Sequence, residues 1–237
     1  MAADTFETSY EKFIELEREF VRMSEMRDVF GDTHGNLSWK IDDDHVLIKP
    51  SGISFDKITR RDICAINVRT GEDDVHTGRR PSVDLRHHLK IYQYCPEVRA
   101  ICHSHSPYAT AFAATRRTVP CILTEQADYF GGEINCVAHA IDPDDWSIDV
   151  WTKLLAIDRI RAVLLASHGA LTFGIGDNPA AEAVDLAAAL ERVCHKTYLA
   201  MSLAAGEFKL HSLWDRQITE WHDRYVNRYG QRKDDDV

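Results

Sequence analysis

The sequence lacks any long hydrophobic run, since no stretch approaches the ~18 consecutive apolar residues of a membrane-spanning helix. The N-terminal residues also lack the combination of a basic stretch and an apolar core that marks a secretory signal. Positive charge is scarce: 28 Lys and Arg stand against 38 Asp and Glu, giving a formal net charge of −10. Nucleic-acid binding needs clustered Lys and Arg to neutralise phosphates, so this balance argues against that class. We expect a cytoplasmic protein with neither a membrane nor a nucleic-acid partner.

The cysteines form no C-x-x-C pair, and several lie inside apolar runs, which predicts small buried residues in a reducing compartment rather than a disulfide framework. They are Cys64, Cys95, Cys102, Cys121, Cys136 and Cys194. Internal repeats and low-complexity linkers are also missing. The 237 residues, 44% hydrophobic and 28% charged, have the balance of a globular protein with one sizeable core. We therefore predict a single domain over residues 1–237, with a frayed charged tail over 232–237.

Helical and β-rich segments alternate along the chain. Apolar residues at helical spacing predict an amphipathic first helix of roughly four turns, at Phe13, Leu16, Phe20 and Met23. Further helices are predicted over 85–94, 108–115, 146–156, 178–205 and 211–230. Strands are predicted over 37–41, 46–49, 63–68, 98–103, 136–141 and 162–166. This alternation indicates an α/β fold with a central sheet.

Three histidines stand where predicted strands end. His103 and His105 are two residues apart, and because strand side chains alternate, both imidazoles project from one face and can bind one ion. His168 directly follows the predicted strand 162–166, and Gly169 suits a sharp turn that leaves its imidazole exposed. Three protein ligands with an open fourth position are the arrangement of catalytic zinc. The sequence therefore predicts a catalytic metal site on these histidines, with a carboxylate able to complete the shell.

The other histidines do not fit such a site. His87 and His88 are adjacent in a predicted helix, so they point in different directions and cannot bind one ion together. We expect the remaining histidines, such as His45, His76 and His211, to lie on the surface.

Four further motifs accompany the histidines. They are T-H-G-N-L-S over 33–38, K-P-S-G over 49–52, R-P-S-V-D over 80–84 and C-H-S-H-S-P-Y-A-T over 102–110. With S-H-G at 167–169, this set resembles the class II aldolase and adducin family, in the same order and across essentially the whole chain. The resemblance implies an α/β/α sandwich around a mostly antiparallel sheet. It also implies a divalent ion on the three histidines, zinc or alternatively manganese, and a homotetramer.

Within the family, the sequence is most similar to the L-ribulose-5-phosphate 4-epimerases. Asp84 stands where these have Asp and L-fuculose-phosphate aldolases have Glu, and T-E-Q-A-D-Y-F-G over 124–131 resembles their T-x-H-A-D-Y-F-x-G. R-Y-G-Q over 228–231 resembles their closing Y-Y-G-Q. The resemblance implies that Asp84 faces the metal, and that Asp128 and Tyr229 are acid/base residues, with Tyr229 reaching in from a neighbouring subunit. The implied phosphate-binding residues are Thr33, Gly35, Asn36, Ser51, Gly52 and Ser82.

The implied reaction is epimerisation of a ketose phosphate at C4. The C3–C4 bond breaks by retro-aldol cleavage, the aldehyde rotates, and aldol addition to its other face follows. A divalent cation stabilises the enediolate, and proton transfer on either face requires two groups, such as Asp128 and Tyr229. The alternatives are a class II sugar-phosphate aldolase that stops after cleavage, a decarboxylase of a small hydroxy acid, and a structural protein of the adducin type.

Two residues depart from the epimerase pattern. Val83 replaces the second serine of the usual Ser-Ser pair, and Gln126, which cannot carry a proton at neutral pH, replaces a histidine. Simpler roles stay open for three residues. Asp84 could cap the helix over 85–94, Asp128 could cap a turn, and Tyr229 could be a docking aromatic.

Overall fold

The computed structural model describes residues 2–74, 77–154, 161–206 and 209–229. Within these ranges, seven strands form one sheet in the order β3-β2-β1-β4-β7-β6-β5. The strands are β1 (Asn36–Lys40), β2 (His45–Ile48), β3 (Cys64–Asn67), β4 (Ala100–Ser104), β5 (Cys136–Val137), β6 (Ala162–Leu165) and β7 (Gly169–Gly174). Neighbouring strands are antiparallel except β5 and β6, which are parallel. The expected central, mostly antiparallel sheet is confirmed.

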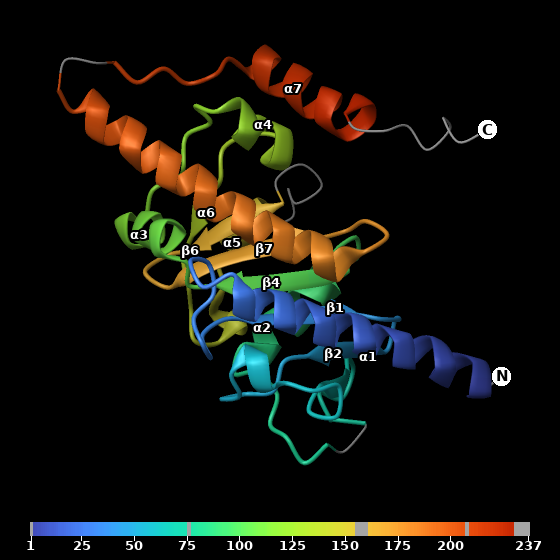
Figure 1. Ribbon diagram of the computed structural model, residues 1–237. Helices are drawn as coiled ribbons and strands as arrows, with labels where there is room; N and C mark the ends of the chain where they lie inside the picture. Colours follow the sequence, from blue (N-terminus) through green and yellow to red (C-terminus); the bar gives the residue numbers. More distant parts are fainter. Residues whose placement is uncertain (1, 75–76, 155–160, 207–208, 230–237) are drawn as a thin grey trace, which may run out of the picture.

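Helices cover both faces of this sheet (Figure 1). They are α1 (Ala2–Glu25), α2 (Leu85–Tyr94), α3 (Pro107–Thr115), α4 (Thr124–Phe130), α5 (Ile148–Leu154), α6 (Pro179–Ala204) and α7 (Asp215–Arg228). Two short 3-10 turns, η1 (Phe55–Lys57) and η2 (Pro143–Asp145), lie in the connections. In Figure 1, α1 and α6 run across one face, while α7 lies beside α4 at the outer edge. The architecture is the α/β/α sandwich expected from the sequence.

The alternation of side chains along β4 divides the core into two layers. Ala100 and Cys102 pack with α1 and α6, where Phe20 and Ala183 are also buried. Ile101 points to the opposite face and packs with residues of α2 and α5. Because side chains two residues apart share a face, His103 lies on the same side as Ile101, between the sheet and α2. The functional residues at the end of β4 are thus placed on the α2 side.

Several predicted elements differ from the structure in extent. The first helix has 24 residues rather than about four turns, and the strand expected over 136–141 contains only Cys136–Val137. The helix expected over 146–156 is α5, Ile148–Leu154, and the last two residues of that prediction lie outside the described residues. The C-terminal helix is shorter at both ends than 211–230. The frayed tail expected over 232–237 also lies outside the described residues.

Two elements have no counterpart in the sequence-based expectation. One is β7, whose six residues are all buried although glycines stand at both ends. The other is α4, which has only seven residues and ends at Gly131 in a left-handed conformation. Both are short segments without a clear amphipathic period, which is why periodicity did not reveal them.

The six cysteines are free thiols, and all but the half-buried Cys136 are buried, as expected. Among the described helices, none combines the length and the apolar character that crossing a bilayer requires.

A buried carboxylate from α6 fixes the turn that follows β4. The Glu191 side chain, 7% exposed, accepts hydrogen bonds from the backbone N–H of Tyr108 at 2.9 and 3.1 Å and from that of Ala109 at 3.0 Å. The first N–H groups of a helix have no acceptor within the helix, and the helix dipole favours a negative charge there. Glu191 therefore anchors the start of α3, two residues after His105.

Replacing Glu191 with alanine leaves these buried N–H groups unpaired. We expect the Glu191→Ala substitution to lower the free energy of unfolding by about 2 kcal/mol, measured by urea denaturation. The matched control is Glu220→Ala, which removes an exposed ion pair with Arg216 on α7. That change is expected to cost no more than about 0.5 kcal/mol. Equal losses in the two variants would contradict the anchoring role.

Candidate metal centre

Three histidine side chains meet where β4 ends and β6 turns into β7. The ligand nitrogens of His103, His105 and His168 all lie within 4.8 Å of one another. The Nε2 atoms of His103 and His105 are 2.8 Å apart, and the ring centroids of the three pairs are separated by 4.6, 4.9 and 4.7 Å. Among the described residues, this is the group of three or more histidine, cysteine or carboxylate ligands that could hold one metal ion.

The orientation of the rings fits a cation. His103 is buried, and its Nδ1–H donates to the carbonyl oxygen of Ala170 at 2.9 Å, which leaves the Nε2 lone pair directed at the cluster. His168 Nε2 is buried without a hydrogen-bond partner among the described residues. Burying a polar atom unpaired is costly, and a cation bound by the cluster would remove that cost. The donor set is therefore suited to a divalent metal.

The charge state of the cluster also suits a metal. Burial lowers the pKa of His103 to about 3, and burial likewise lowers the pKa values of His105 and His168 below their ordinary value. The three imidazoles are consequently neutral at pH 7, and a neutral ring offers its lone pair to a metal without first losing a proton.

Asp84 supplies a negative charge beside the histidines. Its Oδ2 accepts a hydrogen bond from Asn36 Nδ2 at 2.7 Å and lies 4.0 Å from His103 Nε2. Burial pushes the pKa of the Asp84 carboxyl upward, but the adjacent His103 and His88 rings, which stabilise its charge as they become protonated at low pH, and the Asn36 hydrogen bond bring it below its usual value. Although Asp84 precedes α2, its side chain makes no capping hydrogen bond to that helix. The carboxylate therefore faces the cluster rather than the helix.

Two glycines allow the backbone to approach the cluster closely. A Cβ at Gly35 would lie 2.5 Å from the carbonyl oxygen of His103, and one at Gly169 would lie 2.5 Å from that of Ser104. Real Cβ atoms do not come so close to backbone oxygens. Gly169 is thus required for space, whereas the left-handed residue in this turn is Ser167, with φ of 60°. We expected a glycine at position 169 in order to form the sharp turn, and this reason was wrong. The glycine is needed because no Cβ fits at that position.

The residues expected to bind phosphate are gathered around a buried lysine. Ser51 N donates to Arg80 O at 2.8 Å, and Ser82 N donates to Lys49 O at 3.0 Å, which joins the two loops side by side. The Lys49 amine donates to the carbonyl oxygen of Ile53, in the loop that follows Lys49, at 2.7 Å. It also donates to that of Thr33, in the loop before β1, at 3.4 Å. Burial lowers the pKa of Lys49 to about 8.

Lys49 had no predicted role, although a lysine at the end of the predicted strand 46–49 was the available signal. Asn36 connects this group of loops to the metal centre through its hydrogen bond to Asp84. Gly35 and Gly52 both adopt positive φ, at 89° and 72°, so the loops turn sharply beside the cluster. The structure therefore places the expected phosphate-binding residues next to the expected metal ligands.

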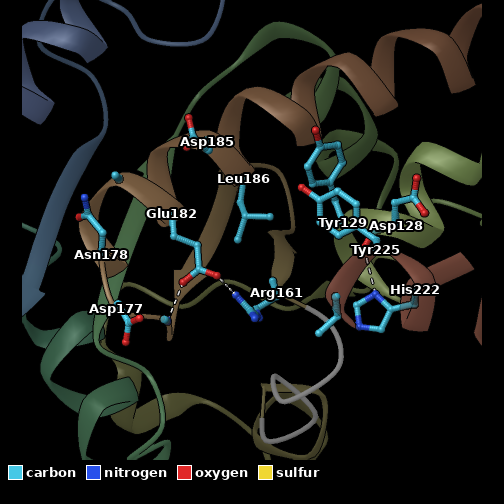
Figure 2. A pocket seen from close by; sticks show the side chains of 13 residues that line it. Asp128, Tyr129, Arg161, Asp177, Asn178, Glu182, Asp185, Leu186, His222 and Tyr225 are labelled. Carbon is cyan, nitrogen blue, oxygen red and sulfur yellow. Dashed lines mark hydrogen bonds and ion pairs between the residues drawn. The ribbon is translucent and has the colours of Figure 1, made fainter. Parts of the chain in front are cut away.

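The two expected acid/base residues lie elsewhere in the chain's own fold. Asp128 lines a cavity of about 510 Å³ between α4, α6 and α7 (Figure 2). The same cavity is lined by Gly176, Asp177 and Asn178, which follow the end of β7 opposite to Gly169. Asp128 pairs with Arg224 of α7 at 3.7 Å, and burial raises the pKa of its carboxyl against the attraction of Arg224.

Tyr229 follows α7 and is 63% exposed. Its ring stacks on Tyr225 with centroids 5.5 Å apart, and the Arg224 guanidinium lies 5.1 Å from its centroid. Tyr225 and His222 line the cavity beside Asp128 in Figure 2. Asp128 and Tyr229 are therefore close to each other on the α7 side, and their contacts are with α7 rather than with the three histidines.

Several other histidines are not surface residues. His88 is fully buried and bonded to Ser38 Oγ at 2.7 Å. His139 is half-buried and stacks on His168, so the expectation that the remaining histidines lie on the surface was wrong for this residue. His211 is exposed and His45 is partly exposed, while His76 lies outside the described residues.

Gln126, which replaces a histidine of the epimerase pattern, has a structural role. Its side chain is buried, and its amide donates to the carbonyl oxygens of Val119 at 3.2 Å and Gly132 at 3.1 Å. These bonds join the two ends of the segment that carries α4. The substitution therefore affects the support of Asp128 rather than the metal centre.

Comparison with known proteins agrees with this geometry. The sequence model of the family described as "Class II Aldolase and Adducin N-terminal domain" matches residues 16–198. The chain is 32% identical to the Mycoplasma pneumoniae protein named "Probable L-ribulose-5-phosphate 4-epimerase UlaF", over 62% of this chain and 64% of that one. It is 30% identical to the L-ribulose-5-phosphate 4-epimerase UlaF of Salmonella paratyphi A, over 73% of this chain and 78% of that one.

Among solved structures, an L-fuculose 1-phosphate aldolase superposes with a TM-score of 0.71 at 25% identity, covering 89% of this chain and 96% of that one. An L-fuculose-1-phosphate aldolase from Thermus thermophilus has the same fold, with a TM-score of 0.67 at 23% identity, covering 82% and 98% of the two chains. The family resemblance of the sequence motifs is thereby confirmed.

The tight contact at Gly169 leads to a test of the metal centre. We expect the Gly169→Ala substitution to weaken zinc binding at least about tenfold, because the new methyl group pushes β7 away from Ser104 and His103. The measurement is a calorimetric titration of zinc into metal-stripped protein. Gly132→Ala is the matched control, since a Cβ there meets nothing within 4 Å. Unchanged affinity in the Gly169 variant would show that the close approach is dispensable.

Proposed function

The chain belongs to the class II aldolase and adducin family, and from this premise we propose that it is a metal-dependent epimerase of a phosphorylated ketose, similar to L-ribulose-5-phosphate 4-epimerase. The observation that carries the proposal is the convergence of His103, His105 and His168 beside Asp84. Relatives at 30–32% identity bear the name of this activity. The structural alternative of the adducin type does not account for a complete cluster of neutral imidazoles.

We propose zinc as the cation, with manganese as the alternative, held by the three histidines and Asp84. Three neutral nitrogens and a carboxylate suit a catalytic zinc ion, which can take substrate oxygen by expanding to five ligands or by exchanging the carboxylate. When bound, the cation supplies Lewis-acid stabilisation for the negative charge that cleavage between C3 and C4 leaves on the ketose fragment.

The phosphate end of the substrate is assigned to the loops around Lys49. Ser82 Oγ accepts a hydrogen bond from Asp84 N at 3.3 Å, so its own proton remains available to a phosphate oxygen. Ser51, Gly52, Gly35, Asn36 and Thr33 complete the anion site by the family resemblance. The Lys49 amine holds the loops at a fixed separation through their carbonyl oxygens. Val83 is 84% exposed, so the hydroxyl that it lacks would have pointed outward.

Proton transfer is assigned to Asp128 and Tyr229. The resemblance implies a neighbouring subunit only for Tyr229, and we extend this to Asp128 because both residues contact Arg224 of α7. In the chain itself both lie beside α7, and their contacts among the described residues are with that helix rather than with the three histidines. A neighbouring copy can bring its pair to the metal centre, where the Asp128 carboxyl and the Tyr229 hydroxyl exchange a proton with the C4 oxygen from opposite faces. The raised pKa of Asp128 moves this carboxyl toward the range useful for acid/base catalysis.

The surface supports such an assembly. Large apolar side chains are exposed along the second half of α6 and around α7, namely Tyr198, Leu199, Leu203, Trp214 and Val226. Clusters of exposed apolar residues commonly mark interfaces between subunits. We propose that residues 1–237 form one domain per subunit and that the subunits form a homotetramer with active sites between them.

An aldolase is the second candidate, favoured by the likeness to solved L-fuculose-phosphate aldolases. Both activities use the same carbon–carbon cleavage and differ in whether the fragments leave. Asp84, rather than Glu, at this position favours the epimerase.

The activity is tested with L-ribulose 5-phosphate and metal-loaded protein. We expect conversion to the C4 epimer, followed by NMR, and a loss of at least about 100-fold after chelation, because the cleavage charge is then unstabilised. Asp84→Asn, which keeps the size of the side chain, is expected to reduce activity at least tenfold by weakening the metal site. Release of free glycolaldehyde phosphate would favour the aldolase. Turnover of neither this ketose nor L-fuculose 1-phosphate would refute both assignments.

The assignment of Asp128 and Tyr229 to a neighbour is tested by co-expression of two inactive variants. His168→Ala removes a metal ligand, and Tyr229→Phe removes the proton-transfer group. If the two residues act in different subunits, random mixing restores intact sites at roughly one position in four. Activity is measured in purified mixed oligomers, with each variant alone as the control. Mixed oligomers without recovered activity would place Tyr229 and His168 in the same subunit's site.

A further inference from the structure

A segment between β5 and α5 covers one side of the metal centre. We call residues 138–146 the strap. Helix α2 holds it through Arg86, which pairs with Asp142 at 2.6 Å and Asp144 at 3.1 Å, and through Lys90, which pairs with Asp144 at 2.5 Å. The strap is therefore attached firmly to the helix that begins at the metal centre.

The strap places one histidine ring flat against a metal ligand. The rings of His139 and His168 have centroids 4.1 Å apart and planes that differ by 1°. His87 of α2 also contacts the His139 ring, with centroids 5.4 Å and planes 30° apart, and its Nε2–H donates to Ala140 O at 2.8 Å. The Trp146 ring contacts the His87 ring with centroids 5.2 Å apart. Ring contacts thus connect Trp146, His87, His139 and His168, and His168 stacks in turn on His103 at 4.9 Å.

This contact differs from metal ligation. The lone pair of an imidazole lies in the plane of its ring, so two parallel stacked rings direct their lone pairs along parallel lines rather than toward one ion. His139 accordingly does not belong to the group of ligand atoms within 4.8 Å. The His139 ring therefore packs against a metal ligand instead of acting as one.

The His168 ring depends on packing for its orientation more than the His103 ring does. The hydrogen bond from His103 Nδ1 to Ala170 O orients that ring. Among the described residues, no such hydrogen bond orients His168, whose Nε2 is buried and unpaired. His168 also follows Ser167, which adopts a left-handed conformation in an exposed turn. His103 stacks on His168 at 4.9 Å with planes 20° apart, and the contact with His139, at 4.1 Å and 1°, is the closer and more parallel of the two that constrain its plane.

We propose that His139 is a positioning residue that holds the His168 imidazole in the orientation required for metal binding, with the strap holding His139 in place. The inference rests on the proposed metal-dependent function. It assigns a role to a residue outside the motifs that identify the family in this chain. The essential property of His139 is its flat ring, not its nitrogens.

The test is cobalt binding to metal-stripped protein, followed by the visible absorption of bound cobalt, which reports coordination geometry. We expect one equivalent to bind to the wild type, and His139→Ala to bind about tenfold more weakly with altered bands. His139→Phe keeps a flat ring and removes both nitrogens, so its affinity and bands should remain within about threefold of the wild type. Arg86→Ala, which loosens the strap, should weaken binding in the same direction but less.

His195→Ala is the matched control, because it removes a histidine ring stacked at 3.9 Å on Tyr108 rather than on a metal ligand. It should bind cobalt like the wild type. Thermal unfolding of the metal-free variants verifies that each is folded. If His139→Ala binds as tightly as the wild type, the inference is wrong while the metal site stands. If His139→Phe is as weak as His139→Ala, the nitrogens matter and the ring-plane role is refuted. A wild type that binds no cobalt would overturn both this inference and the proposed function.

Discussion

The site depends on the close approach of three backbone segments around β4. The carbonyl oxygens of His103 and Ser104 lie so near Gly35 and Gly169 that a methyl group on either glycine would overlap with them. This approach brings β1, the end of β4 and the start of β7 into one compact unit. The three histidines and Asp84 project from that unit or from its immediate neighbours. The ligand geometry is therefore fixed by backbone packing more than by the side chains themselves.

Burial around this unit determines the chemistry. It keeps the histidines uncharged, while Asp84 retains its charge through the hydrogen bond from Asn36 and the neighbouring rings. A partly buried, negatively charged cluster of lone pairs attracts a cation, because electrostatic interactions strengthen as water is removed. Burial acts in the same way on the basic residue Lys49. It lowers the pKa of Lys49, and the amine donates hydrogen bonds to three surrounding carbonyl oxygens.

The sequence allowed the local parts of the site to be predicted. Short-range alternation was sufficient to pair His103 with His105 at one strand end. His168 was added to the group because it follows another predicted strand and lies in a motif that resembles the family's. The order of the sheet, the element β7 and the stacking of His139 on His168 depend on contacts between segments far apart in the chain, which no local pattern encodes. Gly169 shows the same limit in a single residue. The turn was recognised, but the neighbour that requires a glycine lies 65 positions earlier at Ser104.

Asp128 contacts α7 rather than the three metal-centre histidines of its own chain, and this has a consequence for how the protein responds to dilution. If each metal site is completed by a neighbour, an isolated subunit retains its cation but has no partner to move the proton. Turnover per subunit then depends on total protein concentration, and it rises as association proceeds. With active sites between copies, as proposed, the amount of chain that a cell makes would set the activity of each copy.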